Sequence, residues 1–130
     1  MPSFSQSIRP YVDAELRQAW RALRHGARGS SFRHLERAHV LGQASTYHHV
    51  RVHLHMLAWG LRTRRPREMA GQLLRILGAA TKTPFGMVPV GNTGGADISP
   101  VRPLPIPADL AGLIDRARQA ALSPPQVGRH

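Results

Sequence analysis

Apolar residues return every three or four positions along most of this 130-residue chain, which is the period of an amphipathic helix. Four long stretches of this kind follow one another, and a shorter one lies near the C-terminus. The pattern predicts helices over residues 10–25, 31–42, 46–63 and 66–81, and a short last helix that opens at residues 107–109. We therefore expect an all-α fold, an antiparallel helical bundle of four main helices plus a short C-terminal helix, with residues 1–8 as a frayed lead-in.

Turn and cap residues mark the breaks between these stretches. Gly26 and Gly29 suit a turn after the first helix, and Ser45 or Thr46 suits the N-cap of the third. Pro66 stands in the first turn of the fourth helix, where proline is tolerated best. The breaks are short, as they are between antiparallel neighbours in a bundle.

The composition changes after the fourth helix. Residues 82–107 are rich in proline and glycine, which predicts an extended segment lying across the bundle. Residues 123–130 are expected to form a disordered tail. Because a chain of this length builds one hydrophobic core and not two, we expect a single helical domain over residues 1–122.

Positive charge dominates the chain. Eighteen lysines and arginines stand against seven acids, for a net charge of +11, and Arg62, Arg64, Arg65 and Arg67 gather between the third and fourth helices. Such a balance favours anionic partners. However, aromatic residues for base stacking make up only 5% of the chain and no recognition motif is complete, so nucleic-acid binding is the second alternative here.

The absence of cysteine excludes disulfides, thiolate metal ligands and cysteine nucleophiles. The N-terminal sequence contains no apolar signal region, and no apolar run reaches 18 residues. These features predict a cytoplasmic protein that has no membrane partner.

Histidine is concentrated in one part of the chain. Residues 32–56 hold six of the eight histidines. Glu36 and His39 have the Glu-x-x-His spacing by which helical di-iron proteins place two ligands of one metal ion. His49 and His53 stand four residues apart, the spacing of paired imidazoles on zinc-binding helices.

Two further acids border apolar helical faces, Glu15 in the first helix and Glu68 in the fourth. A bundle that turns these faces inward would place carboxylates near the histidines. The sequence therefore predicts a mixed Glu/His metal site whose candidate ligands are Glu15, Glu36, His39, His49, His53 and Glu68. Such donors suit iron, zinc or manganese, and imidazole also suits copper.

This site leaves two functional versions open. A metal with an open coordination position would make a small oxidase or hydrolase, whereas a closed site would belong to a metal-stress protein without catalysis. No Ser/His/Asp triad can be assembled, since Glu36 is the only acid helically close to a histidine. The alternative for these residues is structural, with Glu36 paired to Arg33 or Arg37 and the histidines packed in the core.

The segments His34–His39 and Leu41–Gln43 resemble a family of short bacterial proteins catalogued only as a domain of unknown function. The similarity continues through His49 and His53 to Gly91–Gly95, and covers most of residues 10–120. It implies a shared fold and site but no reaction.

The same resemblance implies that the Gly91–Gly95 loop matters. In a functional interpretation of its residues, this loop closes over the mouth of the bundle and Asn92 or Thr93 reaches a bound ligand. Taken alone, its sequence GNTGG is typical of a tight turn, because it lacks the Lys-Ser/Thr that completes a phosphate-binding loop.

Residues 15–43 also resemble a single helical hairpin of the tetratricopeptide type. Arrays of that type need about three copies for a continuous core, and one is present. This hairpin is the basis of the first alternative, a protein-interaction module without catalysis. We expect a small-molecule ligand or a protein as partner in preference to nucleic acid, and a homodimer through the stripe of His48 and His55 stays open.

Overall fold

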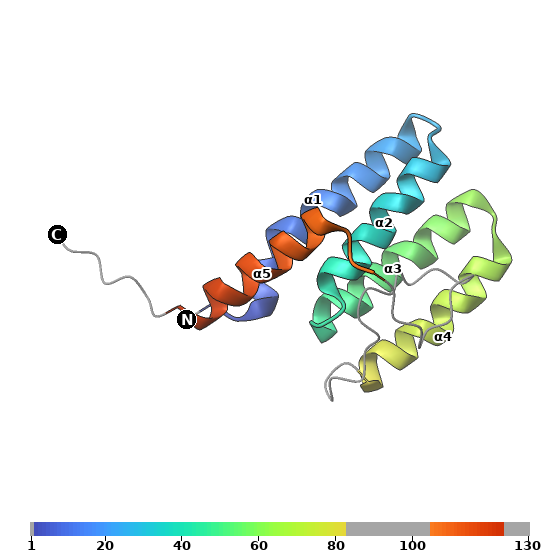
Figure 1. The fold of residues 1–130 in the computed structure, drawn as a ribbon. Coiled ribbons are helices and arrows are strands. Elements are labelled where there is room, and N and C mark those ends of the chain that lie inside the picture. The colour runs from blue at the N-terminus through green and yellow to red at the C-terminus, as the bar shows by residue number, and fades with distance from the viewer. Residues whose placement is uncertain (1, 83–104, 124–130) are drawn as a thin grey trace.

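The computed structural model describes residues 2–82 and 105–123. Figure 1 shows its five helices, α1 (Phe4–Arg24), α2 (Arg28–Gly42), α3 (Thr46–Thr63), α4 (Pro66–Lys82) and α5 (Ala108–Leu122). The described residues contain no strand, and the all-α fold is confirmed. Most of the expected extended segment, residues 83–104, and the tail, residues 124–130, lie outside the described part of the chain.

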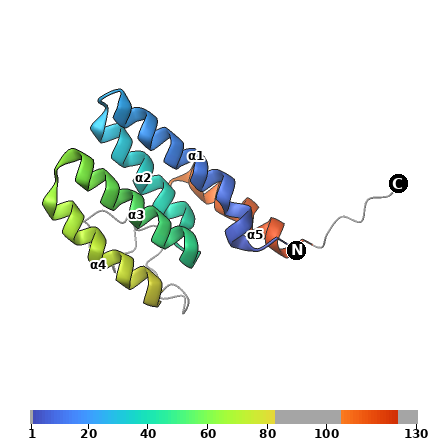
Figure 2. The same ribbon diagram turned by 180° about the vertical axis from the view of Figure 1, so that it is seen from behind.

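Helices α1 to α4 run alternately up and down (Figures 1 and 2). Helix α1 packs mainly on α2, and α3 mainly on α4, while contacts between α2 and α3 join these two hairpins. Helix α5 lies along the N-terminal part of α1 and also contacts α2. The protein is thus two helical hairpins side by side, with α5 added to the outer side of the first.

The hydrophobic core is aliphatic and lies mainly between α1, α2 and α3. Leu35, Leu41 and Met56 are fully buried, so each contributes roughly 1.5–3 kcal/mol through the hydrophobic effect. Helix α4 has a different character, because its Leu73 and Leu74 are exposed whereas Gln72 is fully buried. The face that α4 presents inward is therefore partly polar, and this polar face takes part in the site described below.

The first helix begins at Phe4, so the expected frayed lead-in at residues 1–8 is wrong. Ser3 and Gln6 form a capping box, in which each side chain accepts a hydrogen bond from the backbone of the other residue. Ile8 is fully buried. Pro10 lies inside the helix, where it removes one backbone hydrogen bond, and the cap and the burial of Ile8 outweigh that loss.

The second helix begins at Arg28, three residues before the expected start at Ser31. Gly26, at φ +78°, makes the turn, and the Ser31 hydroxyl donates a hydrogen bond to the Ala19 carbonyl at 2.7 Å instead of capping the helix. The third helix has Ser45 as its N-cap, as the sequence predicts.

Gly42 allows α2 and α3 to approach closely where they meet. A Cβ atom at this position would lie 2.8 Å from the Cβ of His48, closer than two carbon atoms can pack. The short connection and this contact bring the last turn of α2 against the first turns of α3. No helix in the described residues is long and apolar enough to cross a membrane.

Candidate metal centre

Three buried histidines meet where α2 and α3 lie side by side. His39 comes from the last turn of α2, and His49 and His53 from successive turns of α3. Their rings lie 4.7–5.0 Å apart between centroids, and their exposed fractions are 3%, 8% and 2%. Each offers a ring nitrogen within 4.8 Å of the others. We call this group the histidine cluster.

The local sequence explains this meeting. His39 lies three residues before the end of α2, and His49 three residues after the start of α3, so a tight connection sets them opposite each other. His53 follows His49 by four residues, which keeps both rings on one face of the helix.

The distance between His39 and His53 suits two ligands of one ion. Their Nε2 atoms are 3.2 Å apart. Two nitrogen ligands at 2.0–2.1 Å from a tetrahedral zinc ion are separated by about 3.3–3.4 Å, so this pair is already placed for metal. Since the cluster as a whole spans up to 4.8 Å between ligand atoms, His49 is the ligand that has to move closer.

A chain of hydrogen bonds from α4 fixes the tautomer of His53. The amide Nε2 of Gln72 donates to Oε1 of Glu68 at 2.7 Å, because an ionised carboxylate only accepts. The other end of that amide, Oε1, therefore faces His53 and accepts from its Nδ1 at 2.5 Å. With the hydrogen on Nδ1, the neutral ring turns a lone pair on Nε2 toward His39. This is how outer residues orient imidazole ligands of metals.

Burial also keeps His49 and His53 uncharged. It lowers the pKa of His53 from 6.5 to about 3, although the hydrogen bond to Gln72 acts in the opposite direction. Burial lowers the pKa of His49 to about 4. Both rings are thus neutral at pH 7, which is the form that binds metal.

The predicted acidic ligands lie elsewhere. Glu68 is buried but reaches His53 only through Gln72. Glu36 is half-buried on α2 and does not belong to the histidine cluster. Asn92 and Thr93 lie outside the described residues. The structure therefore brings together three of the six candidate ligands, all of them histidines, and connects a fourth indirectly.

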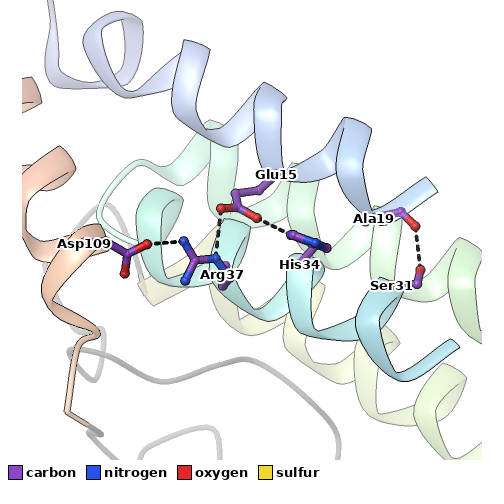
Figure 3. Close-up of polar contacts among 6 residues, drawn as sticks. All are labelled: Glu15, Ala19, Ser31, His34, Arg37 and Asp109. Carbon is purple, nitrogen blue, oxygen red and sulfur yellow. Dashed lines mark hydrogen bonds and ion pairs between the residues drawn. The ribbon is translucent and has the colours of Figure 1, made fainter. Parts of the chain in front are cut away.

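Glu15 belongs to a separate ion-pair network that joins α1, α2 and α5 (Figure 3). Its carboxylate accepts from Nδ1 of His34 at 2.6 Å and from Nε of Arg37 at 2.9 Å. Arg37 also pairs with Asp109. Through this pairing Asp109 raises the pKa of Arg37, and Arg37 lowers the pKa of Asp109.

The other two histidines of α3 connect that helix to the N-terminal region and α1. Nε2 of His48 donates to the Ser5 carbonyl at 2.8 Å, and Nδ1 of His55 accepts from the Trp20 indole at 2.9 Å. Gln72, which the sequence did not place in the site, could have been noticed through its i, i+4 spacing from Glu68.

Together, the fold and the site define an all-α bundle with a buried histidine cluster between its two hairpins. The chain belongs to the family described as "Protein of unknown function (DUF3703)", whose sequence profile matches residues 6–114. This confirms the resemblance to a family of unknown function, and all the histidines of the cluster, Gln72 and Glu68 fall inside the match. No curated protein and no solved structure matches the chain.

Proposed function

We propose that this protein binds a transition-metal ion through His39, His49 and His53. The observation that carries the proposal is the convergence of three buried imidazoles, one of which is held with its Nε2 lone pair toward the others. Taking three polar rings out of water is costly unless their nitrogens gain strong partners. His39 and His53 share a hydrogen bond, and a metal ion bound by all three rings would give each of them a stronger partner.

The donor set narrows the choice of metal. Imidazole nitrogen suits zinc, copper and iron, whereas manganese favours oxygen donors, and copper(II) binds most tightly of the divalent series. Since the cluster within the described residues contains only imidazoles, zinc and copper fit best.

Three protein ligands leave the fourth position of a tetrahedral ion to water or a substrate atom, as in catalytic zinc sites. A metal ion held by His39, His49 and His53 would supply a nucleophile for hydrolysis, because it would lower the pKa of a bound water toward neutral pH. Hydrolysis is therefore the reaction class that such a centre supports, and storage or sensing of the ion is the function of the same site without a reaction.

Metal binding is tested with the untagged protein, first stripped with a chelator and then titrated with Zn²⁺ and with Cu²⁺ by calorimetry. We expect one ion per chain. His53→Asn should weaken binding by roughly 100-fold or more, since loss of an outer residue alone costs about 10–100-fold. The matched control is His34→Asn, which alters a histidine of the ion-pair network on the neighbouring face of α2.

Circular dichroism establishes that both variants fold. Failure of the wild-type protein to bind either ion would overturn the proposal. An equal loss of affinity in His34→Asn and His53→Asn would also overturn it, because the binding would then not depend on the histidine cluster.

A further inference from the structure

The α1–α2 turn and the α3–α4 turn lie at the same end of the bundle (Figures 1 and 2). Residues of both regions line an open cavity there. Its volume is about 610 Å³, within the range of small-molecule sites. Its lining includes Trp20, Arg24, Arg28 and Arg62, and none of the lining residues that the structure describes is acidic. We call these four residues the arginine pocket.

Within residues 2–82 and 105–123, no acid pairs with the three arginines of the arginine pocket. No aspartate or glutamate occurs between Glu15 and Glu36 or between Glu36 and Glu68, and these two intervals contain both turns. Among the described residues, no ion pair involves Arg24, Arg28 or Arg62. Three positive charges therefore face one cavity.

Arg62 is held in place by other side chains. Its guanidinium lies over the Trp20 ring, 5.2 Å from the ring centroid. The Trp20 indole is fixed in turn by its hydrogen bond to His55. A guanidinium oriented in this way loses less freedom when it binds an anion, and its planar fork of donors fits two oxygens of a phosphate.

Arg28 is the member that a purely structural explanation does not cover. Arginine near the C-terminal end of a helix is stabilised by the helix dipole, which accounts for Arg24 in α1 and Arg62 in α3. Arg28, however, is the first residue of α2, where the dipole disfavours a cation. The N-cap of α2, Ala27, offers no side-chain acceptor to the first-turn amides. An anion placed in the cavity would satisfy both Arg28 and this helix end.

We propose that the arginine pocket binds a small molecule that carries a chain of phosphates, such as a nucleoside triphosphate or inorganic tripolyphosphate. The three arginines would offset most of the negative charge of such a ligand, and the cavity has the size for it. This site is separate from the histidine cluster, so its test is independent of metal binding.

The test measures binding of tripolyphosphate and of a nucleoside triphosphate to the full chain by calorimetry, at about 0.15 M salt so that diffuse charge effects are screened. We expect Arg28→Gln and Arg62→Gln each to weaken binding by about tenfold, because each removes charge-assisted hydrogen bonds. The matched control is Arg118→Gln, an exposed arginine of α5, which should leave the affinity unchanged.

Three results would overturn the proposal. One is no binding of either ligand by the wild-type protein. Another is an equal effect of Arg118→Gln, which would show diffuse attraction to the whole surface. The last is tight, salt-dependent binding of duplex DNA without binding of tripolyphosphate, which would make this end of the bundle a nucleic-acid surface.

Discussion

The histidine cluster and the ion-pair network both connect α2 to neighbouring helices with imidazole groups, yet their environments are opposite. His53 is 2% exposed and contacts another histidine and an amide. The side chain of His34 is 30% exposed and contacts the carboxylate of Glu15 directly. Each ring contacts a second titratable group, His39 in the case of His53 and Glu15 in the case of His34. The two environments therefore differ in how far the ring is buried and in which group it contacts.

Residues of α4 explain why the environment of His53 differs from that of His34. In the histidine cluster Gln72 stands between Glu68 and His53, so the acid orients the ring without sharing a proton with it. The ring stays neutral and keeps a lone pair for a ligand. In the ion-pair network no amide lies between Glu15 and His34, so the carboxylate and the imidazole contact each other directly.

Lowering the pH should produce the largest difference in behaviour between the histidine cluster and the ion-pair network. The metal-free folded protein holds His49 and His53 with pKa values of about 4 and about 3, against 6.5 for the free side chain. Below pH 6.5 the unfolded state therefore binds protons that the folded state does not. The free energy of unfolding should fall by up to about 1.4 kcal/mol per pH unit for each of these histidines.

Urea unfolding of the chelator-treated protein between about pH 7 and about pH 5 checks this slope. His49→Asn should reduce the loss of stability on acidification, whereas His34→Asn should leave it in place. A free energy of unfolding that stays constant over this range would contradict the neutral, buried state of the histidine cluster.

Removing the Gln72 amide, which lies between Glu68 and His53, should have the next largest effect. Gln72→Leu takes away the acceptor that holds the hydrogen on Nδ1 of His53, so zinc affinity should fall by about 10–100-fold. The matched control is Glu68→Gln, whose side-chain oxygen can still accept from Gln72 and preserve its orientation. Competition with a zinc-sensitive dye measures both variants.

If Glu68→Gln lost as much affinity as Gln72→Leu, the charge of Glu68 and not the orientation of Gln72 would be the important feature. Equal affinity of Gln72→Leu and the wild-type protein would mean that the tautomer of His53 does not limit binding. With either result, the Gln72 amide would no longer explain the difference between the histidine cluster and the ion-pair network.

The sequence predicts the position of two residues relative to each other when both lie in one helix, because their spacing along the chain then fixes it. The third and fourth helices begin where caps and proline place them, and His49 and His53 share a face because of their spacing alone. At the N-terminus the predicted start at residue 10 is wrong. Proline suits the first turn of a helix, which favours a start at Pro10, but Ser3 and Gln6 carry the capping-box pattern and begin the helix earlier.

Contacts between helices were harder to predict. Glu36 and His39 are near neighbours on α2, but only His39 belongs to the cluster that forms with α3. Glu15 borders the apolar face of α1, and it is the register of α1 against α2 that pairs it with Arg37. The register of α4 against α3 similarly brings Gln72, one turn beyond Glu68, to His53. The hydrophobic periodicity of a helix does not determine its register against the neighbouring helix.

The smallest expected effect comes from Glu15→Gln, which tests whether the two regions are independent. This change removes the ion pair to Arg37 and the carboxylate that accepts the hydrogen bond of His34. Because the network is partly exposed, the free energy of unfolding should fall by only about 1 kcal/mol, and by less at high salt. Zinc affinity should not change, since Glu15 is not a member of the histidine cluster. A loss of zinc affinity without a loss of stability would instead make Glu15 a ligand, as its position in the sequence first indicated, and would remove the distinction between the two regions.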